Sequence, residues 1–307
     1  MEVINKPQKR RSRIYSSEAR VAYICLIPAF LGLFFLTYLP LAGVVGISLT
    51  NWTGLKSPQF VGLDNYVKLF TTDPYIKDSI IATIYFAVLS VIGSMIYSLF
   101  IAMLLNRKIP ARGFFRAIFY VPYVLPAVAI YVGWSWLYEG NFGFFNYVLS
   151  ELGLNKILFI ADSSYVVPSL SLISIWLAGN LIVIFLAGLQ NVPGVYHEAA
   201  EMDGANGWKR FCHITLPCMT PIIFYNLLLS LIANLQVVTP ALALTNGGPG
   251  NSTRFLTYLM YDQAFVNYKL GYASATTVII FAILAVFTVV LFKTSNFWIY
   301  NEGGDDK

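Results

Sequence analysis

A polar stretch between two long apolar segments contains the residue types best suited to docking another protein. The residues concerned are Glu198, Ala199, Ala200, Asp203 and Gly204, followed after nine further residues by Ile214, Leu216 and Pro217. Residues 198–202 are good helix formers, and the helix dipole favours carboxylates near a helix start. Because Gly204 can supply the permissive backbone of a turn, we expect a helix, a turn and a second helix across residues 194–213.

The two alanines of this loop indicate that it docks another protein. Ala199 and Ala200 leave a helix surface with almost no side chain, so that a groove on another protein can approach the backbone closely. A solvated connector is the alternative, and it would account for a bare Glu-Ala-Ala triplet. The complete spacing, flanked by apolar segments and ended by Pro217, favours docking.

No catalytic or metal-binding group is apparent in the sequence. The cysteines Cys25, Cys212 and Cys218 are odd in number and form no Cys-x-x-Cys pair, which argues against disulfides and a metal site. His197 and His213 lie near the two ends of the polar loop. A lone histidine in such a loop is more often a solvated side chain than a metal ligand. A Walker-type glycine-rich loop ending in Lys-Ser/Thr is also absent, so we expect ATP and Mg²⁺ to be bound by another polypeptide.

Composition places the chain in a membrane. Hydrophobic residues make up 57% of the 307 residues and charged residues only 11%, with a mean hydropathy of +0.66, whereas a soluble domain has about 25% charged residues. Six runs without Asp, Glu, Lys or Arg are long enough for a span, which needs about 20 residues. They cover residues 21–49, 79–105, 117–138, 166–190, 214–238 and 270–292. Because backbone groups in lipid must be satisfied internally, these continuous runs predict an all-α integral membrane protein with six transmembrane helices.

The distribution of lysine and arginine predicts how these spans are oriented. Basic residues gather in segment 1–20 and in loop 107–116, which has no acidic residue, whereas the loops on the other side mix them with aspartate and glutamate. Excess positive charge marks the cytoplasmic side, so both termini and loop 194–213 are expected inside. The chain then consists of a basic cytoplasmic tail (1–20), a six-helix domain (21–293) and a second cytoplasmic tail (294–307). Its net charge of +5 is explained by flanks that face anionic lipid, without nucleic-acid binding.

The six apolar runs also argue against ion coupling. An ion- or proton-coupled carrier normally keeps an ionisable residue at membrane depth, and none of the six runs contains Asp, Glu, Lys, Arg or His. We therefore expect the energy for transport to come from a separate ATPase.

Polar and aromatic side chains within the spans suit a neutral polyol as the transported solute. These side chains are Tyr123, Asn180, Asn226, Ser230, Asn234 and Gln236, together with Trp134, Trp136 and Trp176. A hydroxyl-rich ligand needs amide and hydroxyl partners and flat apolar surfaces for its ring faces. Anchoring at the membrane interface and hydrogen bonding between helices are the alternative roles of such residues.

The docking loop resembles the pattern of a known family. Glu-Ala-Ala, three residues, Gly, nine residues and Ile-x-Leu-Pro is the cytoplasmic loop pattern of permease subunits in binding-protein-dependent ABC importers. Segments 120–126, 189–193 and 244–249 are similar to landmarks of the carbohydrate branch, and the similarity covers nearly the whole chain. The resemblance implies the type I permease fold in a bacterial or archaeal cell (inner) membrane. It also implies three partners: a second related permease, an ABC ATPase dimer and an extracytoplasmic solute-binding protein.

Similarity to the maltose-importer permease of this type implies which residues line the substrate path. These residues are Tyr123, Trp176, Leu177, Asn180, Ser230 and Asn234, with Ala127, Ala233 and Val237 beside them. The last three are smaller or less polar than their counterparts, and the chain lacks that subunit's large extracytoplasmic insertion and two extra N-terminal helices. We therefore expect a different sugar or oligosaccharide. A permease for glycerol 3-phosphate or another polyol is the alternative, and an ion-coupled carrier or a membrane enzyme is a more distant one.

Overall fold

The computed structural model describes residues 17–300, and the regular structure of this part is helical apart from one isolated β-bridge between Thr50 and Phe60. In chain order the elements are α1 (Ser17–Leu33), η1 (Phe34–Tyr38), α2 (Leu39–Ser48), α3 (Asp64–Thr71), α4 (Ile76–Asn106), α5 (Arg112–Val124), α6 (Ala127–Leu137), α7 (Phe144–Glu151), α8 (Val166–Trp176), α9 (Gly179–Asn191), α10 (Gly194–Met202), α11 (Gly207–Arg210), η2 (Phe211–Thr215), α12 (Leu216–Cys218), α13 (Thr220–Leu235), η3 (Ala241–Thr245), α14 (Leu256–Tyr261), η4 (Asp262–Val266) and α15 (Leu270–Ser295), where η marks a π-helical segment. The expected tails 1–20 and 294–307 lie partly outside the described residues.

All six expected spans are present, but three of them are broken. Val21–Ser48, Ile76–Asn106 and Leu270–Ser295 are each long and apolar enough to cross a membrane. The other three are bent pairs: α5 with α6 at 99°, α8 with α9 at 48°, and Gly207–Cys218 with α13 at 66°. Counting each bent pair as one span, the prediction of six transmembrane helices is confirmed, as three continuous and three broken spans.

Local sequence explains where one of the breaks falls. Leu125 adopts an extended conformation, with φ −71° and ψ 150°, because the following Pro126 disfavours helical geometry in the residue before it. At the break between α8 and α9, Gly179 lies so close to α5 that a Cβ there would be 2.8 Å from the carbonyl oxygen of Phe119. Breaks at membrane depth are tolerated where the freed backbone lines a cavity.

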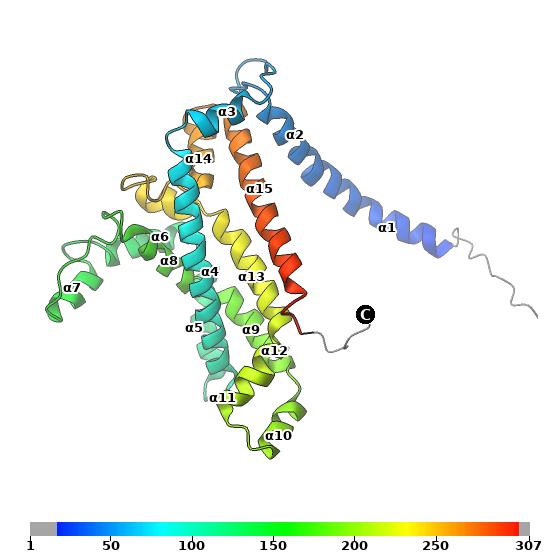
Figure 1. Cartoon of the computed structure of the whole chain (residues 1–307), viewed down its shortest axis with the longest axis vertical. Coiled ribbons are helices and arrows are strands. Elements are labelled where there is room, and N and C mark those ends of the chain that lie inside the picture. The colour runs from blue at the N-terminus through cyan, green and yellow to red at the C-terminus, as the bar shows by residue number, and fades with distance from the viewer. Residues whose placement is uncertain (1–16, 301–307) are drawn as a thin grey trace, which may run out of the picture.

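The long helix α4 is the axis of the bundle (Figure 1) and packs against α8, α9 and α13. Ser90, Ser94 and Ser98 repeat every four residues along α4 and are all buried. Such a row of small residues allows neighbouring helices to approach closely. In contrast, α1 and η1 lead away from the bundle, and α2 joins it by packing on α15.

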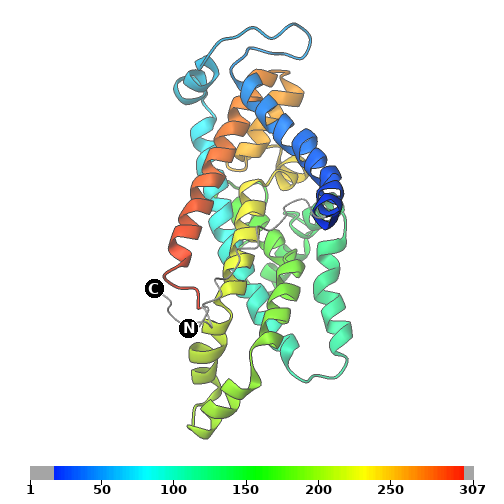
Figure 2. The ribbon, with the colours of Figure 1, turned by 90° about the vertical axis from the view of Figure 1, so that its right-hand side faces the viewer.

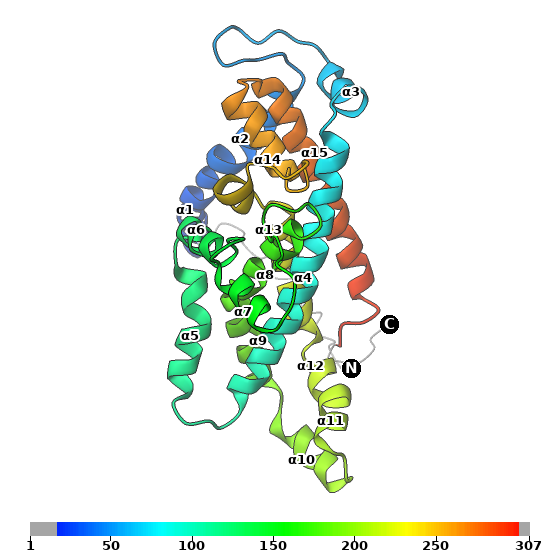
Figure 3. The same cartoon turned by 90° about the vertical axis from the view of Figure 1, so that its left-hand side faces the viewer.

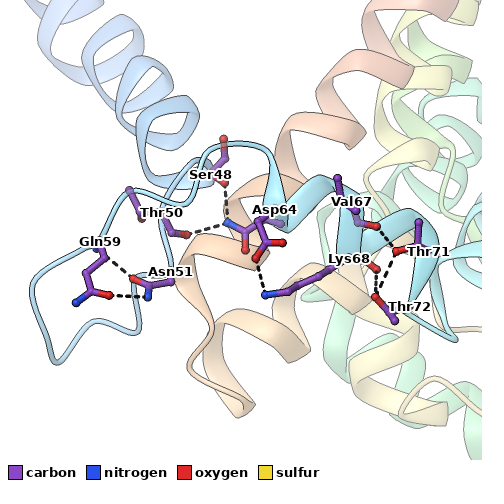
Figure 4. A network of polar contacts seen from close by, with 10 residues as sticks. Ser48, Thr50, Asn51, Gln59, Asp64, Val67, Lys68, Thr71 and Thr72 are labelled. Carbon is purple, nitrogen blue, oxygen red and sulfur yellow. Dashed lines mark hydrogen bonds and ion pairs between the residues drawn. The ribbon is translucent and has the colours of Figure 1, made fainter.

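The two ends of the molecule are formed by different helices. Helices α10 and α11 and the start of α5 lie at one end, and α3 and α14 lie at the other (Figures 2 and 3). At the α3 end, Asn65 donates from Nδ2 to the carbonyl oxygens of Ser48 and Thr50 at 2.7 and 2.8 Å, within the polar network of Figure 4. The backbone N–H of Gly271 donates to the carbonyl of Trp52 at 2.9 Å, which ties this loop to the start of α15.

Candidate functional site

A cavity of about 430 Å³ lies where the broken helices meet, and its size is within the usual range of ligand pockets, roughly 300–1,000 Å³. It is bounded by the α5–α6 bend, the α8–α9 break and the C-terminal end of α13. Every residue that lines it is uncharged. The cavity can therefore solvate hydroxyl and amide groups but offers no counter-charge for an ion.

The structure brings most of the sequence-predicted path residues together in this cavity. Tyr123, Leu177, Asn180, Ser230 and Asn234 all line it, and so do Ala127, Ala233 and Val237. Trp176 lies outside the lining and packs edge-on against Trp134, with ring centroids 5.6 Å apart. Asn226 is fully buried elsewhere and donates to the carbonyl of Leu181 at 3.2 Å.

The two central amides differ in what they bind within the protein. The Oδ1 atom of Asn234 accepts a hydrogen bond from Ser174 Oγ at 3.0 Å, and its Nδ2 donates to the Ser230 carbonyl at 2.8 Å. Asn234 thus links α8 to α13. The Asn180 amide makes no hydrogen bond with any described residue, and it is partly exposed in the cavity. Asn180 is therefore available to a solute, and so is Gln236, which also lines the cavity and makes no side-chain hydrogen bond with a described residue.

Sequence reasoning missed four further polar residues of the lining: Ser94, Tyr131, Ser174 and Thr239. Ser94 belongs to the buried serine row of α4, and its four-residue spacing was a usable indication of a packed polar face. Ser174 carries no comparable indication, because its role depends on contact with Asn234, which lies 60 residues further along the chain.

The polar loop 194–213 forms the predicted helix, turn and helix as α10 and α11. Gly204 has a φ of +76°, in the left-handed region that favours glycine, and it follows directly on the last turn of α10. Asn206 caps α11 by accepting a hydrogen bond from the backbone N–H of Lys209 at 2.9 Å. The turn is closed by an ion pair between Arg210 Nη1 and Glu201 Oε2 at 2.9 Å.

The motif residues of this loop form a shallow groove of about 350 Å³. Ala199, Ala200, Asp203, Ile214 and Pro217 all line it. Glu198 and Gly204 lie on the loop outside this lining, and Leu216 begins the short helix α12. The groove thus places the two alanines of α10 beside the start of the fifth span.

Three large apolar side chains project from the same polar loop. Met202 is 89% exposed, Trp208 is 71% exposed and Val195 is 70% exposed. Large apolar side chains on an aqueous loop mark a protein-interaction surface. The sequence could have shown this, because Trp208 stands among polar and small residues.

A metal centre is not formed within residues 17–300: no group of three or more His, Cys, Asp and Glu side chains in this range could hold an ion. The site is therefore an uncharged cavity at the helix breaks and an exposed docking loop, joined by α9. A multi-pass helical protein with these two features is a transport permease.

Comparison with known proteins agrees with this class. Residues 94–298 match the family described as the binding-protein-dependent transport system inner membrane component. A probable ABC transporter permease of Bacillus subtilis, YesP, is 33% identical over 97% of each chain. The trehalose/maltose permease protein MalF of Thermococcus litoralis is 31% identical over 93% of this chain and 97% of its own. A solved bacterial alginate ABC transporter has a chain of the same fold, with a TM-score of 0.78 at 22% identity over 91% of this chain and 94% of that chain.

The chain belongs to the family of binding-protein-dependent transport system inner membrane components. It is a permease subunit of an ABC importer and a multi-pass protein of the inner membrane. Its part in that importer is to provide a path through the membrane.

Proposed function

We propose that this permease forms half of the path for a neutral sugar or oligosaccharide. The observation that carries the proposal is the uncharged cavity, whose lining combines the Asn180 amide with hydroxyl and aromatic groups. Relatives named for sugar transport support it: MalF of Thermococcus litoralis is a trehalose/maltose permease, and MsmF of Streptococcus mutans, 33% identical over 88% of this chain, belongs to a multiple sugar-binding transport system.

The alternative solute, glycerol 3-phosphate or a related phosphorylated polyol, would enter this cavity without meeting a cation. An uptake experiment distinguishes a neutral sugar from a phosphorylated polyol as the solute. The permease is reconstituted with its partners, and uptake of neutral di- and trisaccharides is compared with that of glycerol 3-phosphate. Uptake of a neutral sugar supports the proposal, and uptake of the phosphate ester alone contradicts it.

A second related permease is proposed to complete the path, and an extracytoplasmic solute-binding protein to deliver the solute. Tyr123 lines the cavity yet remains 49% exposed, as expected of a surface that another subunit covers. The outer end, with α3 and α14, is then where the solute-binding protein docks.

Loop 194–213 is proposed to dock an ABC ATPase dimer that holds the ATP and Mg²⁺. Support comes from its exposed apolar side chains and from its position, because it lies at the same end as the basic loop before α5 (Figure 3). The positive-inside rule assigns that end to the cytoplasm.

The docking proposal is tested with Trp208→Ala. An aromatic anchor at the centre of an interface contributes about 2 kcal/mol or more, so ATPase affinity should fall roughly 30-fold. Phe114, an exposed aromatic residue near the start of α5 at the same end, provides the matched control, and Phe114→Ala should leave the affinity unchanged. If Trp208→Ala and the parent bind the ATPase with equal affinity, α11 is not part of the docking surface.

A further inference from the structure

Three helix ends converge where the docking loop leaves the bundle. They are the C-terminal end of α4, the N-terminal end of α5 and the C-terminal end of α9. Gln190 lies in the last turn of α9, and α10 begins at Gly194. A displacement of α10 therefore reaches α9 through the segment that contains Gln190, and it reaches α13 through α11, η2 and α12.

Gln190 is bound by two arginines of α5. The amide orientation of Gln190 is assigned from these two guanidinium donors: with its oxygen turned toward them, it accepts hydrogen bonds from Arg112 Nη2 and Arg116 Nη2, each at 2.9 Å. Arg112 also donates from Nε to the carbonyl oxygen of Leu105 at 2.5 Å, which satisfies one of the unpaired carbonyls at the end of α4. Hydrogen bonds from a charged donor are shorter and stronger than neutral ones, so these contacts hold the three helix ends together.

Helices α5 and α9 are also in close contact beside the cavity. A Cβ on Gly179, the first residue of α9, would be 2.8 Å from the Phe119 carbonyl oxygen and 3.2 Å from Tyr123 Cβ of α5. Only a glycine allows this approach without displacing one of the two helices. Helices α5 and α9 are thus in contact at both ends, beside the docking loop and beside the cavity.

Each helix of the pair presents a residue to the solute cavity. Tyr123 is on α5 and Asn180 is on α9, and both line the cavity. If α9 moved without α5, the distance between these two groups would change. Because α5 and α9 are held together at both ends, Tyr123 and Asn180 move together.

We propose that Gln190, with Arg112 and Arg116, forms a polar clamp that makes α5 and α9 move as one body when α10 is displaced. These three are positioning residues: none of them lines the solute cavity or the groove of the docking loop. The proposal rests on the proposed docking of the ATPase at α10. It adds the route by which that displacement reaches Tyr123 and Asn180.

The test compares three variants in the complete reconstituted importer, with ATPase affinity, ATP hydrolysis and solute uptake measured separately. Gln190→Leu removes the acceptor at similar volume, and uptake per ATP hydrolysed should fall roughly tenfold while ATPase affinity is retained. Gln190→Glu keeps an acceptor for both arginines and should retain coupling. Asn191→Leu is the matched control, because this neighbouring amide is exposed and makes no side-chain hydrogen bond with a described residue.

Normal uptake per ATP in Gln190→Leu would overturn the clamp, and so would a loss of coupling in Gln190→Glu equal to that in Gln190→Leu. Loss of ATPase affinity in Gln190→Leu would also overturn it, because Gln190 would then belong to the docking surface. If Gln190→Leu fails to insert, Arg116→Leu tests the same contact from α5, and normal coupling there contradicts the proposal. Failure of ATPase docking at α10 is recognised independently, by unchanged affinity in Met202→Ala, because Met202 is an exposed apolar side chain of α10.

Discussion

Replacing Gly204 by valine tests whether the shape of the docking loop matters to the importer. Gly204 has a φ of +76°, a conformation that residues with a Cβ rarely adopt. No other atom lies within 4 Å of where its Cβ would stand. The substitution therefore introduces backbone strain without a steric clash, and the expected effect comes from conformation alone.

The magnitude follows from the cost of a left-handed conformation, which is about 1–2 kcal/mol for a residue with a Cβ. If the loop keeps this turn only when bound to the ATPase, that cost appears as a loss of affinity of roughly 5–30-fold. Asparagine adopts the left-handed conformation more readily than other such residues, so Gly204→Asn should have a smaller effect than Gly204→Val.

The assay is a titration of the purified ATPase onto the reconstituted permease, followed by ATP hydrolysis and uptake. Gly207→Val is the matched control, because Gly207 lies in the same loop with equally open space around it but without a positive φ. We expect Gly204→Val to weaken ATPase binding or to uncouple hydrolysis from uptake, at normal membrane insertion. Equal behaviour of Gly204→Val and Gly207→Val would refute the reasoning, since conformation would then not matter.

Three further predictions concern the cavity, the orientation and the outer end. Asn180→Leu should lower uptake severalfold, through lost solute hydrogen bonds of about 0.5–1.5 kcal/mol each, with ATPase affinity unchanged. Asn234→Leu should in addition lower the melting temperature of the complex, because it breaks the hydrogen bond between α8 and α13. A cysteine in place of Asp203, in a cysteine-free background, should react with an impermeant thiol reagent only after the cells are opened. Ready labelling of intact cells would contradict the predicted cytoplasmic location of this loop. Gly271→Ala should destabilise the protein, because its Cβ would overlap a backbone carbonyl, whereas Gly46→Ala, with open space around it, should not.

The membrane class and the docking loop could be predicted because each depends on neighbouring residues. Hydropathy over about 20 residues identifies a span regardless of what the rest of the chain does. The helix–turn–helix of loop 194–213 likewise follows from helix formers around Ala199 and a glycine at the turn. The breaks in the spans were less predictable, since an apolar run remains apolar whether the helix in it is straight or bent.

The sequence by itself determined that this protein is helical, membrane-spanning and equipped with a docking loop, because composition and local spacing fix those properties. The tertiary structure decided which polar residues share the cavity, that Asn234 is used between helices while Asn180 makes no side-chain hydrogen bond with a described residue, and that Gln190 meets Arg112 and Arg116. These pairings join residues 60 or more positions apart, and one amide in an apolar run looks like another until its neighbours in space are known. Hydrogen bonds depend on distance and angle, and only the packed bundle sets those.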